Sequence, residues 1–555
     1  MNATTEKSWL ASYPAGIPAD VDVRAFASIN DVLARSVERF RERPAFANMG
    51  VTLTYGDLDA RTREFAAFLQ QHAGLKAGER LAIMMPNVLQ YPIAIFGALR
   101  AGLVVTNINP LYTPRELKHQ LVDSGASAIV VLENFGHVLA EVIADTQVKT
   151  VVTTRIGDLL GFPKGALVNF VVKYVKHMVK PFRLPATIDL REALRLGAQR
   201  ELQPVAATLD DVAFLQYTAG TTGVAKGVVL THGNIVANLQ QASAWVGPFL
   251  KEGEEVVVTP LPLYHIFSLT ANCLLFMKIG GLIYLITNPR DFKGFVHELK
   301  KLRFTVITGV NTLYRALLNT PGFDQLDFSS LKVALGGGMA VQRAVANDWK
   351  RVTGRTLVEA YGLTETSPGV CINPIDLPEY NGKIGLPIPS TEVSIQDENG
   401  RMLAPGQAGE ICVRGPQVMR GYWNRPEQTA KVLTPDGWFH TGDIGMLDEH
   451  GFVSVIERKD DLINVSGFNV YPTEIEDVVA HHPGVLESAA IGVPDEHSGE
   501  VVKLFVVRKD PALTAEALRE YCQQNLTRYK VPKHIEFRDS LPKSPVGKIL
   551  RRALR

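Results

Sequence analysis

The sequence predicts an α/β protein built from more than one lobe, and three observations support this prediction. Short apolar segments alternate with helical stretches along the chain, an alternation that is typical of α/β layers. The chain has 555 residues, whereas one domain usually holds roughly 50 to 250 residues. Glycine and proline crowd residues 384–421, as they do where one structural unit gives way to the next.

Several segments justify the α/β prediction individually. Residues 58–72 form a helical stretch. Residues 80–86, 127–132 and 149–153 are apolar runs of strand length. Residues 212–215 read as another strand. We therefore expect buried strands with helices between them.

Two positions are candidates for lobe boundaries. Residues 385–389 combine glycine and proline, and residues 457–461 form a charged stretch between apolar strands. About a hundred residues follow the second position, enough for a small α/β domain. We expect an N-terminal domain over residues 1–459 and a C-terminal domain over residues 460–555.

The charge balance gives no reason to expect nucleic acid as a partner. The chain carries 58 Lys plus Arg against 57 Asp plus Glu, a net charge of +1. Bulk attraction to a polyanion requires a clear positive excess. Any basic feature must therefore be local.

Other features predict a cytoplasmic protein. The first seven residues lack both a signal-peptide core and a glycine for myristoylation. No apolar run reaches the roughly 18 to 20 residues of a membrane-spanning helix. Cysteines without metal-ligand or redox spacing are expected to be reduced core thiols; they are Cys273, Cys371, Cys412 and Cys522.

A glycine-rich segment over residues 217–227 has the composition of a phosphate-binding loop. Glycines let backbone N–H groups approach oxygens, Thr218, Thr221 and Thr222 can add hydroxyl donors, and Lys226 adds a positive charge. The segment is not a Walker A loop, because the Gly-Lys-Ser/Thr sequence is missing at the required distance. An ordinary turn is the alternative interpretation.

Four further segments extend the pattern: residues 359–366, residues 437–443, the pair Arg458 and Asp460, and residues 542–548. In this order and spacing, with the glycine-rich loop, they resemble the core motifs of the adenylate-forming superfamily. That superfamily contains acyl-CoA synthetases, firefly-type luciferases and nonribosomal peptide adenylation domains. The resemblance covers nearly the whole chain. Residues 262–267, 307–313 and 466–476 most closely resemble bacterial long-chain fatty acyl-CoA synthetases.

The resemblance implies the reaction and its small-molecule partners. ATP activates a carboxylic acid as an acyl-adenylate, with Mg²⁺ present, and CoA then takes the acyl group. An ionised carboxylate needs no general base to attack the α-phosphate, so the missing Ser-His-Asp triad is no objection. The reaction needs neutralised phosphate charge and alignment of two anions that repel each other.

The resemblance also assigns roles to individual residues. Glu365 is implied as the Mg²⁺ ligand, Lys548 as the cation beside the attacked phosphate, and His265 as a neighbour of the acyl carboxylate. His265 as a hydrogen-bonded core histidine is the alternative. A mobile C-terminal domain would turn about a hinge at Asp460. For the nucleotide, the resemblance implies that Tyr361 stacks on adenine and that Asp443 and Arg458 hold the ribose. Gly337 and Gly338 would allow close approach of the backbone. The rest of the nucleotide site would consist of Tyr217, Thr218, Gly220, Thr221, Thr222, Gly223, Lys226, Glu359, Gly362 and Thr364.

Two positions depart from the commonest form of the loop. Ala219 stands where Gly or Ser is usual, and Ala225 where Pro is frequent. Both replacements are small, so they bear on the rigidity of the loop or its affinity for nucleotide more than on the reaction. The charged positions are retained at Glu365, Asp443 and Lys548.

A long-chain fatty acid is the favoured substrate. An amino-acid substrate would bury an ammonium group, which needs a nearby carboxylate, and residues 263–270 contain no Asp or Glu. Residues 267–276 are apolar and could line an acyl tunnel or belong to the core. Medium-chain and coumarate-type acids remain alternatives, as does a fatty acyl-AMP ligase that stops at the adenylate.

A basic amphipathic helix is predicted over residues 167–179. Leu167, Phe170, Tyr174 and Met178 recur at helical spacing, with Asn169 and the lysines on the other, polar face. The helix could contact anionic lipid at the inner face of the membrane, or it could pack on the protein's own core. A non-catalytic fatty-acid-binding membrane protein is a further alternative, but it would leave the nucleotide motifs unexplained. We also expect a homodimer.

Overall fold

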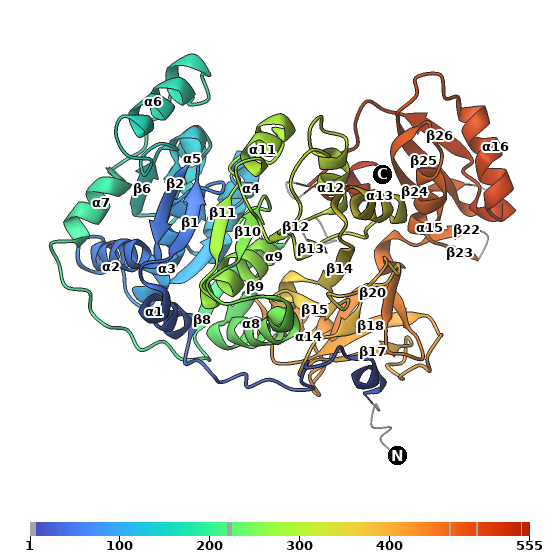
Figure 1. Ribbon diagram of the computed structural model, residues 1–555, viewed down its shortest axis with the longest axis horizontal. Coiled ribbons are helices and arrows are strands. Elements are labelled where there is room, and N and C mark those ends of the chain that lie inside the picture. The colour runs from blue at the N-terminus through green and yellow to red at the C-terminus, as the bar shows by residue number, and fades with distance from the viewer. Residues whose placement is uncertain (1–6, 219–224, 466–467, 496–497, 545–546) are drawn as a thin grey trace.

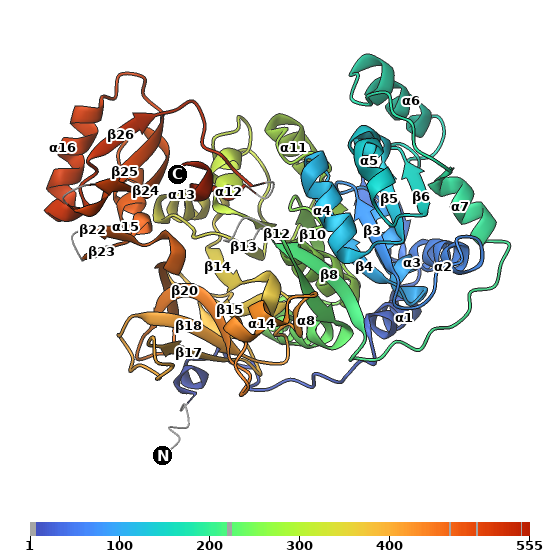
Figure 2. The same cartoon turned by 180° about the vertical axis from the view of Figure 1, so that it is seen from behind.

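The computed structural model confirms the α/β fold class and describes residues 7–218, 225–465, 468–495, 498–544 and 547–555. Figures 1 and 2 show two large sheets with helices around them, a smaller sheet below, and a separate C-terminal lobe at one side. The cleft described below lies where these parts meet.

The eight-stranded sheet forms one half of the N-terminal part. Its central strands are parallel, and antiparallel pairs close it at the β8–β9–β19 end. The three strands expected from the first apolar runs are confirmed as β3, β5 and β6, and the expected strand at 212–215 extends to Thr218. In spatial order the strands are β19 (Gly421–Tyr422), β9 (Lys226–Thr231), β8 (Val212–Thr218), β4 (Val104–Asn107), β3 (Arg80–Met84), β5 (Ala128–Leu132), β6 (Thr150–Thr154) and β7 (Thr187–Asp189).

The nine-stranded sheet forms the other half and is also parallel at its centre. Residues 385–389 lie at its edge, immediately before the next sheet begins at Glu392. In spatial order its strands are β16 (Leu386–Pro387), β15 (Gly369–Ile372), β14 (Leu357–Gly362), β13 (Val333–Gly336), β12 (Val306–Gly309), β10 (Val256–Thr259), β11 (Leu282–Leu285), β1 (Pro44–Asn48) and β2 (Val51–Thr54).

Local sequence signals define where several helices begin. The predicted helix at 58–72 is α2 (Tyr55–Gln71), and Thr54 and Asp57 form a capping box at its start. The same device begins α4 (Pro114–Ser124) and α8 (His232–Val246). The other helices of this part are α1 (Ile29–Phe40), α3 (Gln90–Arg100), α5 (Gly136–Val142), α6 (Lys164–Phe170), α7 (Leu190–Gly197), α9 (Ile266–Ser268), α10 (Leu275–Lys278), α11 (Phe292–Leu299), α12 (Asn311–Leu318), α13 (Arg343–Thr353) and α14 (Pro426–Val432).

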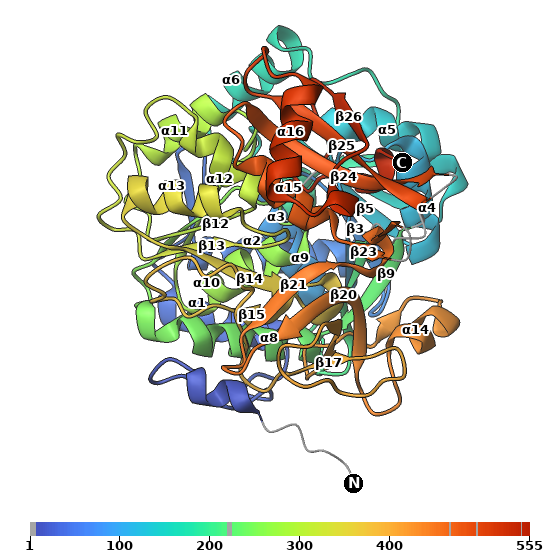
Figure 3. The same cartoon turned by 90° about the vertical axis from the view of Figure 1, so that its right-hand side faces the viewer.

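Two smaller sheets complete the chain. An antiparallel four-stranded sheet contains β17 (Glu392–Gln396), β18 (Gly409–Arg414), β20 (Phe439–Leu447) and β21 (Val453–Arg458). After the turn Lys459–Asp461, the C-terminal lobe has its own hydrophobic cluster. Figure 3 shows this lobe in front of the rest of the molecule. It contains β22 (Ile463–Val465), β23 (Phe468–Val470), β24 (Val485–Asp495), β25 (Gly499–Arg508), β26 (His534–Phe537), α15 (Pro472–Ala480) and α16 (Ala515–Asn525).

The basic amphipathic helix differs from its prediction in extent and orientation. Helix α6 begins at Lys164 and continues as a π-helical segment, Val171–Val175, so residues 176–179 are not part of it. Asn169 was expected on the outer, polar face, but it faces inward: its Oδ1 accepts from the Gly157 N–H at 2.8 Å, and its amide donates to Asp158. These bonds hold the helix against the protein.

Five large apolar side chains of this element and of the residues that flank it are exposed, so they do not pack on the core, whereas Val168 is partly buried against the main hydrophobic cluster. The exposed fractions are 93% for Phe162, 63% for Leu167, 54% for Phe170, 59% for Tyr174 and 51% for Met178. Within the described residues, no helix has the length and apolar content needed to cross a bilayer. All four cysteines are unpaired and buried, as expected for core thiols.

His232 joins two helices and should make stability depend on pH. It is 3% exposed, and its Nδ1 accepts from the Ile29 N–H at the start of α1. Burial lowers its pKa to about 4. As pH falls from about 6.5 towards 4, the unfolded chain binds a proton that the native ring excludes, so the free energy of unfolding should fall by about 3 kcal/mol.

The matched variant is His232→Asn, which keeps an acceptor but does not titrate. Calorimetric melting temperatures between pH 4 and 7 should show a weaker pH dependence in this variant than in the parent. The other histidines are present in both proteins, so the difference reports His232. Identical pH dependence in the two proteins would contradict the assignment.

Candidate functional site

A large cleft of about 1720 Å³ lies where the lobes meet. Residues at the carboxyl ends of parallel strands contribute to both walls: Thr218 ends β8, Val310 follows β12, Gly337 follows β13 and Gly362 ends β14. Open α/β sheets bind ligands in such crevices. The four-stranded sheet and the end of the chain close the other sides, so every part of the fold contributes to the site.

The two ends of the glycine-rich segment belong to antiparallel strands at the cleft. Strands β8 and β9 pair Tyr217 with Gly227 and Thr218 with Lys226. Tyr217, Thr218 and Lys226 line the cleft, and the Lys226 ammonium lies 5.1 Å from the ring centre of Tyr422. The hydroxyl of Tyr217 donates to the Asp123 carboxylate at 2.7 Å, so this hydroxyl already has a hydrogen-bond acceptor within the protein. Gly220, Thr221, Thr222 and Gly223 lie outside the described residues.

Strand β14 brings three predicted residues to the cleft, and Glu359 has a different environment from the others. Glu359 is 4% exposed, and its oxygens accept from the Val341 N–H at 3.1 Å and the Tyr380 hydroxyl at 2.7 Å. Burial raises its pKa to about 7. Glu359 therefore holds in place the backbone around Val341, in the segment that follows β13. At Gly362 a Cβ atom would lie 2.0 Å from the Pro368 carbonyl oxygen, so no larger residue fits.

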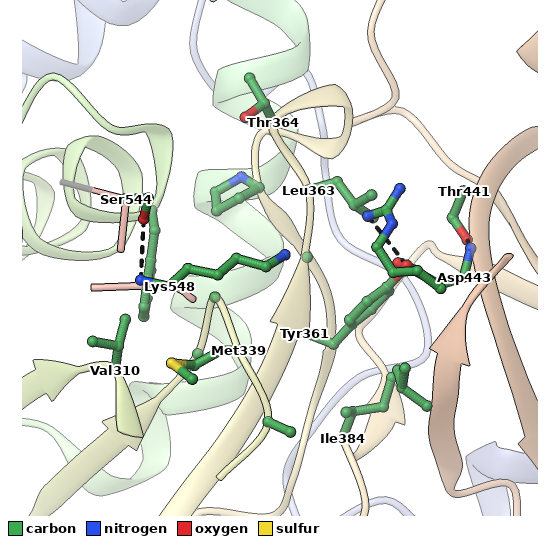
Figure 4. A pocket seen from close by; sticks show the side chains of 18 of the residues that line it. Val310, Met339, Tyr361, Leu363, Thr364, Ile384, Thr441, Asp443, Ser544 and Lys548 are labelled. Atoms are coloured by element: carbon green, nitrogen blue, oxygen red, sulfur yellow. Dashed lines mark hydrogen bonds and ion pairs between the residues drawn. The ribbon is translucent and has the colours of Figure 1, made fainter. Parts of the chain in front are cut away.

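Tyr361, Asp443 and Arg458 form one connected group. Strands β20 and β21 pair Asp443 directly with Arg458, whose guanidinium lies 3.2 Å from the Asp443 carboxylate. The hydroxyl of Tyr361 donates to the other carboxylate oxygen at 2.5 Å. Figure 4 shows Tyr361 beside Asp443, which comes from strand β20 of the four-stranded sheet. A tyrosine ring held by its hydroxyl presents a fixed face on which a flat ring can stack.

Glu365 provides a carboxylate at the cleft. It lies with Thr364 in the 3-10 turn Thr364–Thr366, and both residues line the cleft. The Tyr422 hydroxyl donates to Oε1 at 2.8 Å. Burial raises the pKa of Glu365, and this hydrogen bond opposes the rise.

The donor set at Glu365 fits Mg²⁺ bound jointly with a substrate. Across the described residues, no group of three or more His, Cys, Asp or Glu side chains is arranged to hold a metal ion. Mg²⁺ is commonly held by one or two carboxylates together with phosphate oxygens. A single carboxylate beside a phosphate-sized space satisfies that requirement.

Gly337 and Gly338 have no side chains, so the backbone itself forms this part of the cleft wall. A Cβ on Gly337 would lie 3.0 Å from the Phe267 ring, tighter than ordinary contacts. Gly338 has φ +76°, a conformation that side chains disfavour. Both residues line the cleft, and their approach to a nucleotide stays a prediction.

Lys548 enters the cleft from the end of the chain. Its backbone N–H donates to Ser544 Oγ at 3.0 Å, and Thr312 donates to the Gly547 carbonyl at 3.3 Å, which ties this turn to the N-terminal part. Figure 4 shows the side chain extending towards the segment that carries Tyr361 and Leu363. Desolvation, and then the Arg458 cation, lower the pKa of the ammonium, although it keeps contact with solvent in the cleft.

His265 lies at the cleft and not in the core. Its Nδ1 accepts from the Phe267 N–H at 3.3 Å, which leaves the proton of the neutral ring on Nε2. Desolvation and the nearby Lys548 cation lower its pKa to about 4. The imidazole is therefore neutral near pH 7. The Nε2–H of a neutral imidazole can donate a hydrogen bond to a carboxylate oxygen.

The segment 267–276 divides between cleft and core. Phe267, Thr270 and Ala271 line the cleft, whereas Leu269 and Cys273 are fully buried in the main hydrophobic cluster. The core interpretation is therefore confirmed for Leu269 and Cys273, whereas an acyl tunnel lined by the three cleft residues stays a prediction. The π-helical stretch Leu269–Leu274 contains residues of both groups.

Sequence reasoning missed two residues of the site. Tyr422 contacts both Glu365 and Lys226, and Asp123 binds Tyr217 and Arg425. Tyr422 stands in a turn-rich segment without periodicity, and Asp123 has the appearance of an exposed helix residue. No sequence pattern marks either one.

Comparison with known proteins gives matches over nearly the whole chain. A model described as AMP-binding enzyme matches residues 33–423, and one described as AMP-binding enzyme C-terminal domain matches residues 474–548. A long-chain-fatty-acid–CoA ligase of Escherichia coli O157:H7 is 57% identical over 550 residues, covering 99% of this chain and 98% of the relative. A feruloyl-CoA synthase of Amycolatopsis sp is 35% identical over 524 residues, covering 94% and 97%.

Among solved structures, the ATP-bound crystal structure of MatB from Rhodopseudomonas palustris matches with a TM-score of 0.81. The two chains are 29% identical, and the match covers 95% of this chain and 98% of that one. The arrangement of both lobes is therefore one that occurs in an ATP-binding protein.

Proposed function

Because this chain belongs to the AMP-binding enzyme family, we propose that it is an ATP-dependent ligase that joins long-chain fatty acids to CoA. The fatty acid first reacts with ATP to give acyl-adenylate and pyrophosphate. The thiol of CoA then displaces AMP and forms the thioester. The observation that carries the proposal is the 57% identity to a long-chain-fatty-acid–CoA ligase across both lobes.

The geometry of the cleft suits the first step. The substrate carboxylate is the nucleophile and needs no base, so catalysis consists of aligning two anions and neutralising charge on phosphorus. We assign the ribose to Asp443 and Arg458, adenine to the face of Tyr361, and the acyl carboxylate to neutral His265. These assignments are supported by the observation that all four residues line the same cleft. Glu365 would hold Mg²⁺, which when bound neutralises phosphate charge.

Lys548 has the position of a cation for adenylation alone. Its charge is needed where negative charge grows on the α-phosphate, whereas attack by a thiol on the adenylate does not create that charge. Lys548→Ala should therefore lower adenylate formation by about a hundredfold and leave the conversion of supplied acyl-adenylate to acyl-CoA near the parent rate. Pyrophosphate release and thioester formation measure the two steps separately. A variant that forms adenylate normally but thioester slowly would reverse the assignment.

Substrate length should depend on apolar contact beyond His265. Each buried methylene contributes about 0.8 kcal/mol, so eight additional methylenes could favour a long chain by about 6 kcal/mol. We expect kcat/KM to rise from octanoate to palmitate in assays with ATP, Mg²⁺ and CoA, and coumarate to be a poor substrate. A preference for octanoate or coumarate would favour one of the alternative ligases. Adenylate without thioester would indicate a fatty acyl-AMP ligase.

The domain boundary at residue 460 and the hinge at Asp460 are also part of this proposal. Asp460 belongs to the short turn Lys459–Asp461 between β21 and β22. A rotation at this turn would withdraw Lys548 and open a path for CoA, a movement of the hinge type. The separate hydrophobic cluster of the C-terminal lobe supports movement as one body.

We further propose that the exposed element over residues 162–180 binds anionic membrane at the inner face, making the protein cytoplasmic and peripherally attached. Its apolar side chains stand in a group, and Lys173, Lys176 and Lys180 are exposed among them. Such a surface can insert its apolar groups at the headgroup boundary while its lysines meet lipid phosphates. Figures 1 and 2 show α6 projecting from the body of the protein.

Lys164 contributes less positive charge to this surface than its position in the sequence suggests. The Lys164 ammonium donates to the Met49 carbonyl within the protein. Each of the remaining basic residues can contribute about 1 kcal/mol near an anionic surface, which gives only weak attachment alone. The exposed Leu167 and Phe170 side chains would supply the rest through burial.

Replacing Lys173, Lys176 and Lys180 by Glu should abolish co-sedimentation with anionic vesicles, because attraction becomes repulsion. Activity on detergent-dispersed substrate should stay near the parent level. The matched control replaces the exposed, scattered residues Lys76, Lys251 and Lys509 by Glu and should keep vesicle binding. Binding that survives both the first replacement and high salt, or a parent that never binds, would refute the membrane assignment.

A homodimer remains our proposal for the oligomeric state. Sedimentation velocity over a range of protein concentrations measures it directly.

A further inference from the structure

Arg551 lies where the C-terminal lobe meets the N-terminal part, and its guanidinium contacts three carboxylates. Its Nε and Nη2 donate to the two oxygens of Glu476 at 3.1 and 2.8 Å. Its Nη1 lies 3.1 Å from Glu457 Oε1 and 3.3 Å from Asp461 Oδ2. Glu457 belongs to β21 of the N-terminal part, whereas Glu476 belongs to α15 of the C-terminal lobe. The guanidinium therefore links the two.

The Glu457 end of this link is rigid. Glu457 is 2% exposed, and its carboxylate also accepts from the backbone N–H groups of Arg458 at 2.9 Å and Thr473 at 3.0 Å. The Thr473 hydroxyl donates back to the Ile456 carbonyl at 2.6 Å. Strand β21 and the start of α15 are thus bonded to each other around the carboxylate that Arg551 contacts.

The Arg551 end is coupled to Lys548 through a short stretch of backbone. The Ser544 N–H donates to the Lys548 carbonyl at 2.7 Å, and the Leu550 N–H donates to the Pro542 carbonyl at 2.9 Å. These bonds close the turn that carries Lys548, and Arg551 follows this turn directly. Fixing the guanidinium between Glu457 and Glu476 therefore helps to hold the backbone turn from which the Lys548 side chain extends.

We propose that Arg551 is a positioning residue for adenylation, and that its ion pair with Glu457 holds the lobe orientation that presents Lys548 to the cleft. The inference rests on the proposed function. Glu457, Asp461 and Arg551 lie outside the two segments matched by the family models, residues 33–423 and 474–548. A planar guanidinium suits this task because it pairs with two carboxylates at once.

The pair differs from an ordinary surface ion pair in its burial. The Arg551 side chain is 17% exposed and that of Glu457 is 2% exposed. Removing Arg551 leaves the buried Glu457 carboxylate without its cation, and removing the Glu457 charge breaks the contact of Arg551 with the N-terminal part. A lobe orientation that keeps the pair intact is favoured over one that separates it. Loss of the pair should act on the step that needs Lys548 in the cleft, and not on the step that does not.

The test compares half-reactions in the full-length enzyme. In Glu457→Gln and Arg551→Gln, pyrophosphate release should fall about tenfold or more, while supplied acyl-adenylate should be converted to acyl-CoA within about twofold of the parent rate. Arg551→Lys should be intermediate, because a lysine can pair with Glu457 but lacks the fork that also holds Glu476. The double variant should be no slower than the slower single variant, as for residues that act as one pair.

The matched control is Lys530→Gln. It breaks an ion pair of 2.7 Å with Glu474 that lies entirely within the C-terminal lobe, so both half-reactions should stay near the parent rates. Unchanged pyrophosphate release in Glu457→Gln, or equal slowing of both half-reactions with a lower melting temperature, would overturn the positioning role. A parent that releases no pyrophosphate with any fatty acid would overturn the proposed function, and this proposal with it.

Discussion

The proposed reaction depends on the placement of one ammonium group, that of Lys548, in a cleft built largely by the rest of the chain. Two anions cannot be aligned for reaction without nearby positive charge. The N-terminal part supplies the walls and much of the polar surface of the cleft, but this lysine comes from the other lobe. The site is complete only when the lobes are docked as they are here.

Burial adjusts the charge state of two groups at the cleft. Glu359, hydrogen-bonded to Val341 and Tyr380, has its pKa raised to about 7, whereas His265 has its pKa lowered to about 4. Both shifts arise mainly from desolvation, which disfavours whichever form is charged. The same low-polarity surroundings that shift these pKa values also strengthen the attraction between a cation and phosphate oxygens.

Much of this could be predicted from sequence, because the informative residues lie in short segments. The strands β3, β5, β6 and β8 are continuous apolar runs, and the residues at Glu365, Asp443 and Lys548 stand in recognisable motifs. Contacts between distant segments could not be predicted. Tyr422 reaches Glu365 across 57 positions, and Glu457 meets Arg551 across 94. Nor could helical spacing reveal that Asn169 turns inward, since that depends on the loop at Gly157 and Asp158.

The position of helix α6 has a mechanical consequence. Figures 1 and 2 place α6 on the opposite side of the molecule from the C-terminal lobe, with the body of both large sheets between them. A protein attached to a membrane through α6 would keep its N-terminal part fixed at the surface. The C-terminal lobe, which carries Lys548, would lie away from the membrane and could turn through water without displacing lipid.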